Sequence, residues 1–384
     1  MKILLVGEYN RAHKFIRDGL IALGHEAVVV GLTDDFKKVD VDIKIEHNFT
    51  KGLRKKLKIL LFNLFKIDLH SLSVKKQIHN LKDQLKGSDI VQFINESSFL
   101  CQPKTEIQIF DLFLSWNKKA FLMSCGTDYI SLKYAFDKKF KYSILTPYFE
   151  NRLDQSNFSL GLKYLEPDFV KLHEHIYSHI KGVISSDLDY SIPLRYHPKH
   201  LGLIPHAINV DVLQFSPLKI EDKIIIFHGI NRQNYFKKGN DIFDKALAII
   251  LENHAEKIEI VTVESVPYAI YKNAFDSAHI LLDQVYAYDQ GYNALEAMAK
   301  GKVVFTGAEQ EWLEHYNLEE DTVAINALPN AEAIAKKLEW LILNPDQLVE
   351  ISKKARQFVE KEHHYITCAE QYVKIWKANS SLNF

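Results

Sequence analysis

The sequence is poor in cysteine and glycine and has no excess of charge of either sign. Its three cysteines among 384 residues, Cys101, Cys125 and Cys368, lie far apart, which excludes a disulfide framework and indicates a reducing compartment. Lysine and arginine number 48 against 49 aspartates and glutamates, so the overall charge predicts no nucleic-acid partner. The 15 glycines belong to no repeat or low-complexity tract, so we expect an ordered, globular chain.

Long apolar runs and several common catalytic motifs are also missing. No run approaches the roughly 20 apolar residues that cross a bilayer, and the mean hydropathy is −0.15. We expect no signal peptide before the strand at Met1, and the predicted location is the cytoplasm. Gly-x-Gly-x-x-Gly, P-loop and Gly-x-Ser-x-Gly motifs are absent, which disfavours dinucleotide, ATP and acyl-transfer chemistry. His175 and His179 have helical spacing but no third ligand nearby in sequence, so no metal site is predicted.

Length and periodicity predict two α/β domains. The chain exceeds the ~250 to 300 residues at which one hydrophobic core usually divides, and 47% of it is hydrophobic. Residues 1–32 alternate strand, glycine turn at Gly7, helix and strand. An apolar strand and an amphipathic helix recur within residues 222–254. Both segments are typical of open parallel sheets covered by helices.

The most informative segment, residues 280–307, predicts strand, turn, helix and strand. Its first strand is wholly apolar, Gly291 opens a helix rich in alanine, leucine and methionine, and Gly301 ends it. The free N–H groups and dipole at the start of such a helix suit a diphosphate. Glu296 lies about one turn inside the helix, where its carboxylate suits two ribose hydroxyls. This arrangement predicts a nucleotide-sugar site.

These residues resemble the signature of a large family of retaining glycosyltransferases of the GT-B fold, namely Glu, seven residues, Glu, then Ala-Met-Ala-x-Gly. Glu296 matches the second glutamate, which binds ribose in the family, and Gly291 matches the preceding glycine. The first glutamate, which lies against the donor sugar, is replaced by Tyr288, with Asp289 beside it as a candidate substitute. The resemblance implies an α/β fold with two Rossmann-like domains facing each other across a cleft.

The resemblance also implies a cation clamp for the donor diphosphate. Arg232 and Lys238, ahead of Gly239, resemble the family's Arg and Lys-Gly pair, and two fixed cations can replace a metal against the charge of a leaving diphosphate. A solvated loop is the alternative interpretation. The predicted donor contacts are Gly7, Arg232, Lys238, Tyr288, Gly291, Tyr292, Asn293 and Glu296, with no cofactor beyond the nucleoside-diphosphate-sugar donor itself.

On the acceptor side, residues 124–128 resemble the family's strand-end motif His-Gly-Ser-Asp. Cys125 occupies the histidine position, and a thiol with a pKa near ~8.5 is a poor base. Asp128 is a candidate to orient or deprotonate an acceptor hydroxyl, but an aspartate here is equally typical of a helix N-cap. Together with Lys238 and Asp289, it completes the predicted catalytic set.

The predicted domains are residues 1–203 for the acceptor, residues 204–361 for the nucleotide sugar, and a C-terminal helix in residues 362–384 that crosses back to the first domain. The boundary rests on the stretch from Ile204, which resembles the family's Ile-Pro-x-Gly interdomain segment with Ala207 in place of the glycine.

Residues 51–66 contain six lysines and arginines, no acid, and leucines at helical spacing. They predict a basic amphipathic helix that binds an anionic membrane surface, giving a peripheral location. The alternative is that its apolar side packs on the first domain while its lysines face water.

The predicted function is a hexosyltransferase-type glycosyltransferase that moves a sugar to a saccharide or lipid-linked acceptor, with retention and without a metal, in cell-surface polysaccharide or glycoconjugate synthesis. Two alternatives stay open. A nucleotide-sugar epimerase shares the fold, and Tyr288 and Cys125, which replace family residues, also suit a non-catalytic binding subunit.

Overall fold

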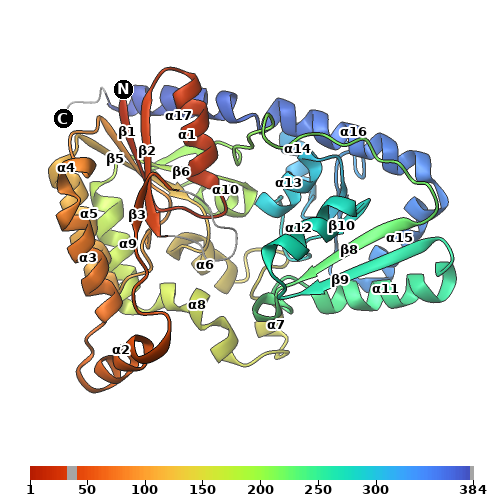
Figure 1. The fold of residues 1–384 in the computed structure, drawn as a ribbon, viewed down its shortest axis with the longest axis horizontal. Coiled ribbons are helices and arrows are strands. Elements are labelled where there is room, and N and C mark those ends of the chain that lie inside the picture. Colours follow the sequence, from red (N-terminus) through yellow and green to blue (C-terminus); the bar gives the residue numbers. More distant parts are fainter. Residues whose placement is uncertain (33–40, 381–384) are drawn as a thin grey trace.

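The computed structural model describes residues 1–32 and 41–380. In this part of the chain, two parallel β-sheets with helices on both faces form two lobes that lie side by side (Figure 1). The α/β fold with two Rossmann-like domains, predicted from the alternation of apolar strands and amphipathic helices, is confirmed.

The first sheet has the order β3-β2-β1-β4-β5-β6-β7, and all its pairs are parallel. Parallel pairing requires a crossover after each strand, so all carboxyl ends meet at one edge of the sheet. The strands are β1 (Lys2–Val6), β2 (Glu26–Leu32), β3 (Ile43–Ile45), β4 (Ile90–Phe93), β5 (Lys119–Ser124), β6 (Val183–Ser185) and β7 (His200–Leu203).

Side chains that alternate along β1 belong to two separate cores. Ile3 and Leu5 pack with the helix that follows β1, whereas Leu4 and Val6 pack on the opposite face. The first-domain helices are α1 (Ala12–Ala22), α2 (Gly52–Phe65), α3 (Leu69–Asn80), α4 (Lys82–Leu85), α5 (Pro103–Trp116), α6 (Tyr129–Phe136), α7 (Thr146–Phe149), α8 (Ser159–Leu162), α9 (Pro167–His179) and α10 (Leu188–Leu194).

The second sheet has the order β12-β11-β10-β8-β9 and is also parallel throughout. Its strands are β8 (Ile224–Ile230), β9 (Ile258–Glu264), β10 (Ile280–Leu282), β11 (Val303–Thr306) and β12 (Ile325–Asn326). The helices that follow β8 along the chain are α11 (Asn240–His254), α12 (Tyr268–Ser277), α13 (Tyr292–Ala299), α14 (Gln310–Tyr316), α15 (Ala331–Leu343), α16 (Pro345–Glu362) and α17 (Tyr365–Ser380).

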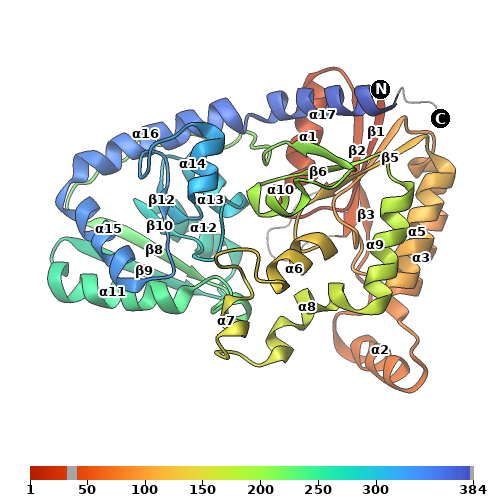
Figure 2. The same cartoon turned by 180° about the vertical axis from the view of Figure 1, so that it is seen from behind.

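The last two helices run along one side of both lobes, α16 over the second sheet and α17 over the first (Figure 2). The buried Trp376 on α17 donates its indole N–H to Gln92 Oε1 of β4 at 2.9 Å. One apolar core continues from α1 and α17 to α13. The boundaries near residues 203 and 361 stay predictions; residues 381–384 of the expected C-terminal segment lie outside the described part of the chain.

The basic helix forms as α2 but does not pack as a core element. None of its residues is buried, and Leu53 and Phe65 are 82% and 65% exposed. Figure 1 shows α2 projecting from the first domain below α3. The alternative in which its apolar side packs on the first domain holds only in part: Leu61 and Phe62 are half-buried, whereas the other apolar side chains of α2 are exposed.

Candidate active site

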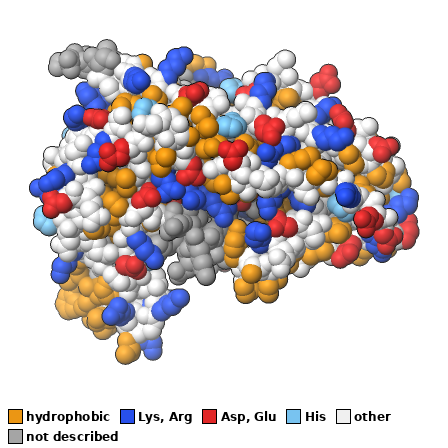
Figure 3. All heavy atoms as spheres, turned by 45° about the horizontal axis from the view of Figure 1, so that its top comes forward, with side chains coloured by type: hydrophobic (Ala, Val, Ile, Leu, Met, Phe, Trp, Pro, Cys, Tyr) orange, Lys and Arg blue, Asp and Glu red, His pale blue; other side chains and the backbone are white. Residues whose placement is uncertain are grey.

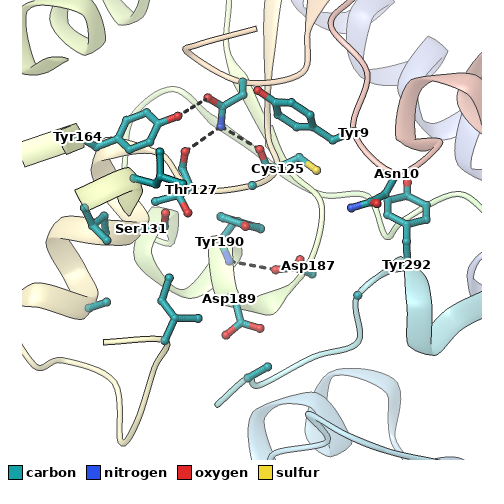
Figure 4. Close-up of a pocket in the computed structure, with 18 of the residues that line it drawn as sticks. Tyr9, Asn10, Cys125, Thr127, Ser131, Tyr164, Asp187, Asp189, Tyr190 and Tyr292 are labelled. Atoms are coloured by element: carbon teal, nitrogen blue, oxygen red, sulfur yellow. Dashed lines mark hydrogen bonds between the residues drawn. The ribbon is translucent and has the colours of Figure 1, made fainter. Parts of the chain in front are cut away.

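A cavity of about 740 Å³ lies between the two domains. Its walls come from loops that follow β1, β4, β5 and β6 and from the segment between β10 and α13. Open α/β sheets bind ligands at this edge because the loops after the strands converge there. In Figure 4, Tyr9, Asn10, Cys125, Tyr164 and Asp189 of the first domain surround the cavity together with Tyr292 of the second.

Two predicted donor residues, Lys238 and Asn293, converge at the start of α13. The buried carboxylate of Asp283, directly after β10, accepts hydrogen bonds from Lys238 Nζ at 3.2 Å and from Asn293 Nδ2 at 3.1 Å. Gly239 has φ +74°, and a side chain there would lie 2.6 Å from Val285. The Lys-Gly pair therefore allows the close approach that brings the lysine beside the first turn of α13.

Glu296, the predicted ribose ligand, is buried one turn further along α13 and contacts the first domain. Its Oε1 accepts a hydrogen bond from Arg11 Nη1 at 2.6 Å. The same guanidinium donates from Nη2 to the Tyr268 hydroxyl at 3.2 Å. Arg11, which begins α1, thus joins the two domains directly at the predicted nucleotide site.

Tyr288, at the position of the family's first glutamate, is buried in an aromatic cluster between the domains. Its ring lies 5.0 Å from that of Phe140 and 5.7 Å from that of Tyr142. Its hydroxyl accepts a hydrogen bond from the Lys141 N–H at 2.8 Å. The three first-domain residues belong to a segment between α6 and α7 that reaches over the second domain, where Tyr142 also bonds Glu309. This arrangement places Tyr288 in an interdomain contact.

Asp289 lines the cavity and takes part in a reciprocal contact across it. One oxygen accepts the Leu188 N–H at 3.1 Å, while the Asp189 carboxylate accepts the Tyr288 and Asp289 N–H groups at 3.1 to 3.2 Å. Burial and, to a smaller extent, the nearby Asp187 raise the pKa of Asp289 to about 7. Burial also raises the pKa of Asp189. The two carboxylates thus join the two domains at the wall of the cavity.

The remaining predicted donor contacts are the turns of both domains. Gly291 begins α13 beside the cavity, and a side chain there would meet no atom within 4 Å. The buried ring of Tyr292 lies 4.3 Å from that of His206. Gly7 has φ +87°, and a Cβ would lie 2.3 Å from Ile94. Gly7 therefore shapes the turn after β1, whereas residues 8–10 line the cavity.

Asp128 occupies the N-cap of α6. Its Oδ1 accepts the Ser131 N–H at 2.7 Å, and its Oδ2 accepts the hydroxyl of Ser124. Thr127 and Ser131 line the cavity, but Asp128 is not part of the wall. The structure therefore gives Asp128 the helix-capping role. Burial raises the pKa of the neighbouring Cys125 thiol, and Asp187 adds to this effect.

Arg232 is placed apart from Lys238. Its guanidinium forms a two-pronged ion pair with Glu264 at the end of β9, and its side chain is 57% exposed. A phosphate at this position would have to compete with that carboxylate. Its predicted role in a diphosphate clamp stays a prediction.

Several residues of the cleft were not predicted from the sequence. They are Arg11, Asp187, Asp189 and His206, together with the segment from Phe140 to Tyr142. Burial lowers the pKa of His206 to about 4, and its Nε2 lies 3.2 Å from Asp187 Oδ2. Arg11 and Glu296 are 285 positions apart; no local spacing could have paired them.

The described residues, 1–32 and 41–380, contain no group of three or more histidine, cysteine, aspartate or glutamate side chains arranged to hold a metal ion. Among the same residues, no helix is long and apolar enough to cross a membrane.

Comparisons with known proteins agree with this geometry. The model of the glycosyl transferase-like family matches residues 239–374, which contain α13 and Glu296. The sequence matches none of the curated proteins compared with it. Among solved structures, sucrose-phosphate synthase of Thermosynechococcus elongatus is similar with a TM-score of 0.63 at 14% identity, covering 98% of this chain and 99% of that one.

Two other similar structures were solved with nucleotides. HepE of Anabaena in complex with UDP and glucose has a TM-score of 0.58 at 11% identity, covering 98% of this chain and 100% of that one. A mutant of S. aureus TarM in complex with fondaparinux, alpha-GlcNAc-glycerol and UDP has a TM-score of 0.62 at 9% identity, covering 98% and 99%. The predicted GT-B fold is thus confirmed, and residues 239–374 are similar to the glycosyl transferase-like family.

Proposed function

We propose that this protein transfers a sugar from a nucleoside-diphosphate-sugar donor to a saccharide or lipid-linked acceptor, with retention of anomeric configuration and without a bound metal. One observation carries the proposal: Lys238, Asn293 and Glu296 converge at the start of α13, where the second domain meets a cavity walled by both domains. The nucleotides in the complexes of HepE and TarM support it.

Different residues would bind different parts of the donor. Glu296 would accept hydrogen bonds from the ribose hydroxyls, and the N–H groups at Gly291 and Tyr292 would bind the diphosphate. Lys238, held by Asp283 and 37% exposed, would neutralise the charge that develops on the leaving nucleoside diphosphate. Asp289 lies on the cavity wall, where the transferred sugar would bind.

Calorimetry with UDP, GDP and ADP tests the donor site. We expect one of the three to bind the wild type and Glu296→Ala to weaken that binding at least about tenfold, since a buried bidentate contact to the ribose is lost. The control is Glu252→Ala on the exposed side of α11, which should bind like the wild type. If no nucleotide binds, the protein is the non-catalytic subunit instead.

The reaction itself is tested with the sugar nucleotide of the base that binds. Glycosyl transfer requires acceptor, so conversion of the donor sugar without acceptor would identify an epimerase. NMR of the anomeric proton in the product tests retention, and unchanged turnover in EDTA tests independence from a metal. Lys238→Ala should lower turnover more than Arg232→Ala, because Asp283 holds Lys238 beside the first turn of α13, whereas Glu264 holds Arg232 at the end of β9.

We further propose that the protein works at the inner face of an anionic membrane, in the synthesis of cell-surface polysaccharide or glycoconjugate. Support comes from α2, whose exposed leucines, isoleucine and phenylalanine lie among lysines and an arginine. Figure 3 shows hydrophobic and basic side chains gathered on the part of the surface that projects from the first domain. Sedimentation with anionic vesicles tests this location.

A further inference from the structure

Arg11 of the first domain reaches into the predicted nucleotide site. Its Nη1 lies 2.6 Å from Glu296 Oε1, and Nη2 donates to the Tyr268 hydroxyl. Arg11 and its neighbour Asn10 both have positive φ, 75° and 52°, a conformation that costs energy in residues other than glycine. The surrounding structure therefore maintains a strained turn that aims the guanidinium across the cleft.

This ion pair conflicts with the role of Glu296. A ribose that takes the carboxylate must displace the guanidinium, whose side chain is only 19% exposed. An unpaired charge in so restricted a space is costly, because neither water nor another acid replaces the lost partner fully. A ligand that brings its own anion removes this cost, and a nucleoside without phosphate does not.

The position for that anion lies within reach of Arg11. Glu296 is four residues beyond Tyr292 on α13, so the two side chains lie on one face about one turn, ~5.4 Å, apart. The first turn of α13 also receives Lys238 through Asp283 and Asn293. A diphosphate at the first turn of α13 would contact Lys238 of the second domain. It would also contact the Arg11 guanidinium of the first domain, after this group had moved by one helical turn away from Glu296.

We propose that Arg11 is a donor-binding residue. When the ribose of the donor binds Glu296, the Arg11 guanidinium leaves Glu296 and binds the diphosphate. It supplies the second cation of the clamp from the opposite domain, so that binding of the diphosphate links the two domains. The inference rests on the proposed donor site and adds the residue by which that site favours a nucleoside diphosphate over a nucleoside.

The test compares a nucleoside with its diphosphate, using the base that binds the wild type. In Arg11→Ala the diphosphate should bind about tenfold or more weakly, since one charge-assisted contact is lost. The nucleoside should bind more tightly than to the wild type, because Glu296 no longer has a competing partner. Arg11→Lys, which keeps the charge, should recover part of the diphosphate affinity.

Arg17→Ala is the matched control. Arg17 lies on α1 as well, and pairs with Asp18 and Asp42, so its removal should leave the preference for diphosphate unchanged. If Arg11→Ala weakens nucleoside and diphosphate in the same proportion, or changes neither, the inference is overturned while the donor site stands. If the wild type binds no nucleotide, or Glu296→Ala retains full affinity, the proposed donor site fails and this inference fails with it.

Discussion

At the scale of single residues, the carboxylates of the cleft differ in what they hold. Asp283 positions Lys238 and Asn293, Glu296 pairs with Arg11, and Asp289 accepts backbone N–H groups from both domains. In the sequence alone, these residues are similar acidic side chains. Their roles follow from burial and from the donors that each one faces.

The variant Asp289→Asn tests how much stability the protein loses when the buried Asp289 carboxyl ionises. Asp289 has a pKa of about 7 in the folded protein, against 3.8 as the unperturbed value. Between pH 4 and pH 7 the folded state therefore binds a proton that the unfolded state does not, and this stabilisation is lost as pH rises through 7. Relative to Asp289→Asn, the wild type should lose up to about 4 kcal/mol of stability over this range.

Urea denaturation of both proteins at pH 4 and pH 8 measures this difference. Comparison within the pair cancels groups that titrate alike in both proteins, while Asp189 and His206, whose pKa values Asp289 itself raises, contribute to the difference. The exposed Asp222→Asn should show no such dependence. A difference between wild type and Asp289→Asn that is constant with pH would contradict the raised pKa.

At the scale of elements, a glycine allows α17 to pack closely against α1. Gly19 is buried on the face of α1 that α17 covers, and a Cβ there would lie 2.3 Å from the Tyr365 carbonyl oxygen and 2.8 Å from Ala369 Cβ. Backbone atoms have little room to move away. The close approach of the two helices therefore depends on the missing side chain.

Gly19→Ala should destabilise the protein, although alanine favours helix by up to about 1 kcal/mol over glycine. Overpacking against the backbone of α17 should cost about 1 to 3 kcal/mol and exceed that gain. Urea denaturation measures the net effect. Ile21→Ala, on an exposed position of the same helix, should change stability by much less. A stabilised Gly19→Ala protein would show that α17 is not held against α1 as described.

At the scale of the whole molecule, the two domains are joined on several sides of the cavity. Tyr288, Asp189 and Arg11 each form contacts between them, and Arg152 bonds Asp241 and Tyr286 across the same cleft. The two walls of the cavity, one from each domain, thus face each other, as the proposed transfer between two substrates requires. Helix α2 lies outside this arrangement, on the far side of the first domain from α17 (Figure 1).

This position of α2 leads to a prediction about membrane binding. The protein should sediment with phosphatidylglycerol vesicles at low salt, but not with phosphatidylcholine vesicles, and high salt should release it. Lys55→Gln with Lys56→Gln should weaken binding roughly 30-fold, at ~1 kcal/mol for each cation. The same double change at Lys353 and Lys354 on α16 is the control. Equal binding by the two double variants would exclude α2 as the docking element.

Much of the fold was predictable because its signals are local. The apolar runs of β1 and β10, the glycine turns after them and the periodicity of α11 each lie within a few residues. The grouping of Lys238, Asn293 and Glu296 was predictable only through the resemblance to a family. Asp128 shows the limit: base and helix cap have the same sequence pattern. Its bonds to Ser124 and Ser131 show that it caps α6, and its role toward an acceptor stays a prediction.

The sequence by itself determined the two α/β units and the place of Glu296 one turn inside its helix, because backbone geometry sets spacing along one element. Only the tertiary structure decided which side chains meet across the cleft. Arg11 reaches Glu296, Asp189 reaches the backbone at Tyr288, and α2 stays exposed. These contacts join positions that are distant in the chain, and they depend on how the two sheets pack against each other.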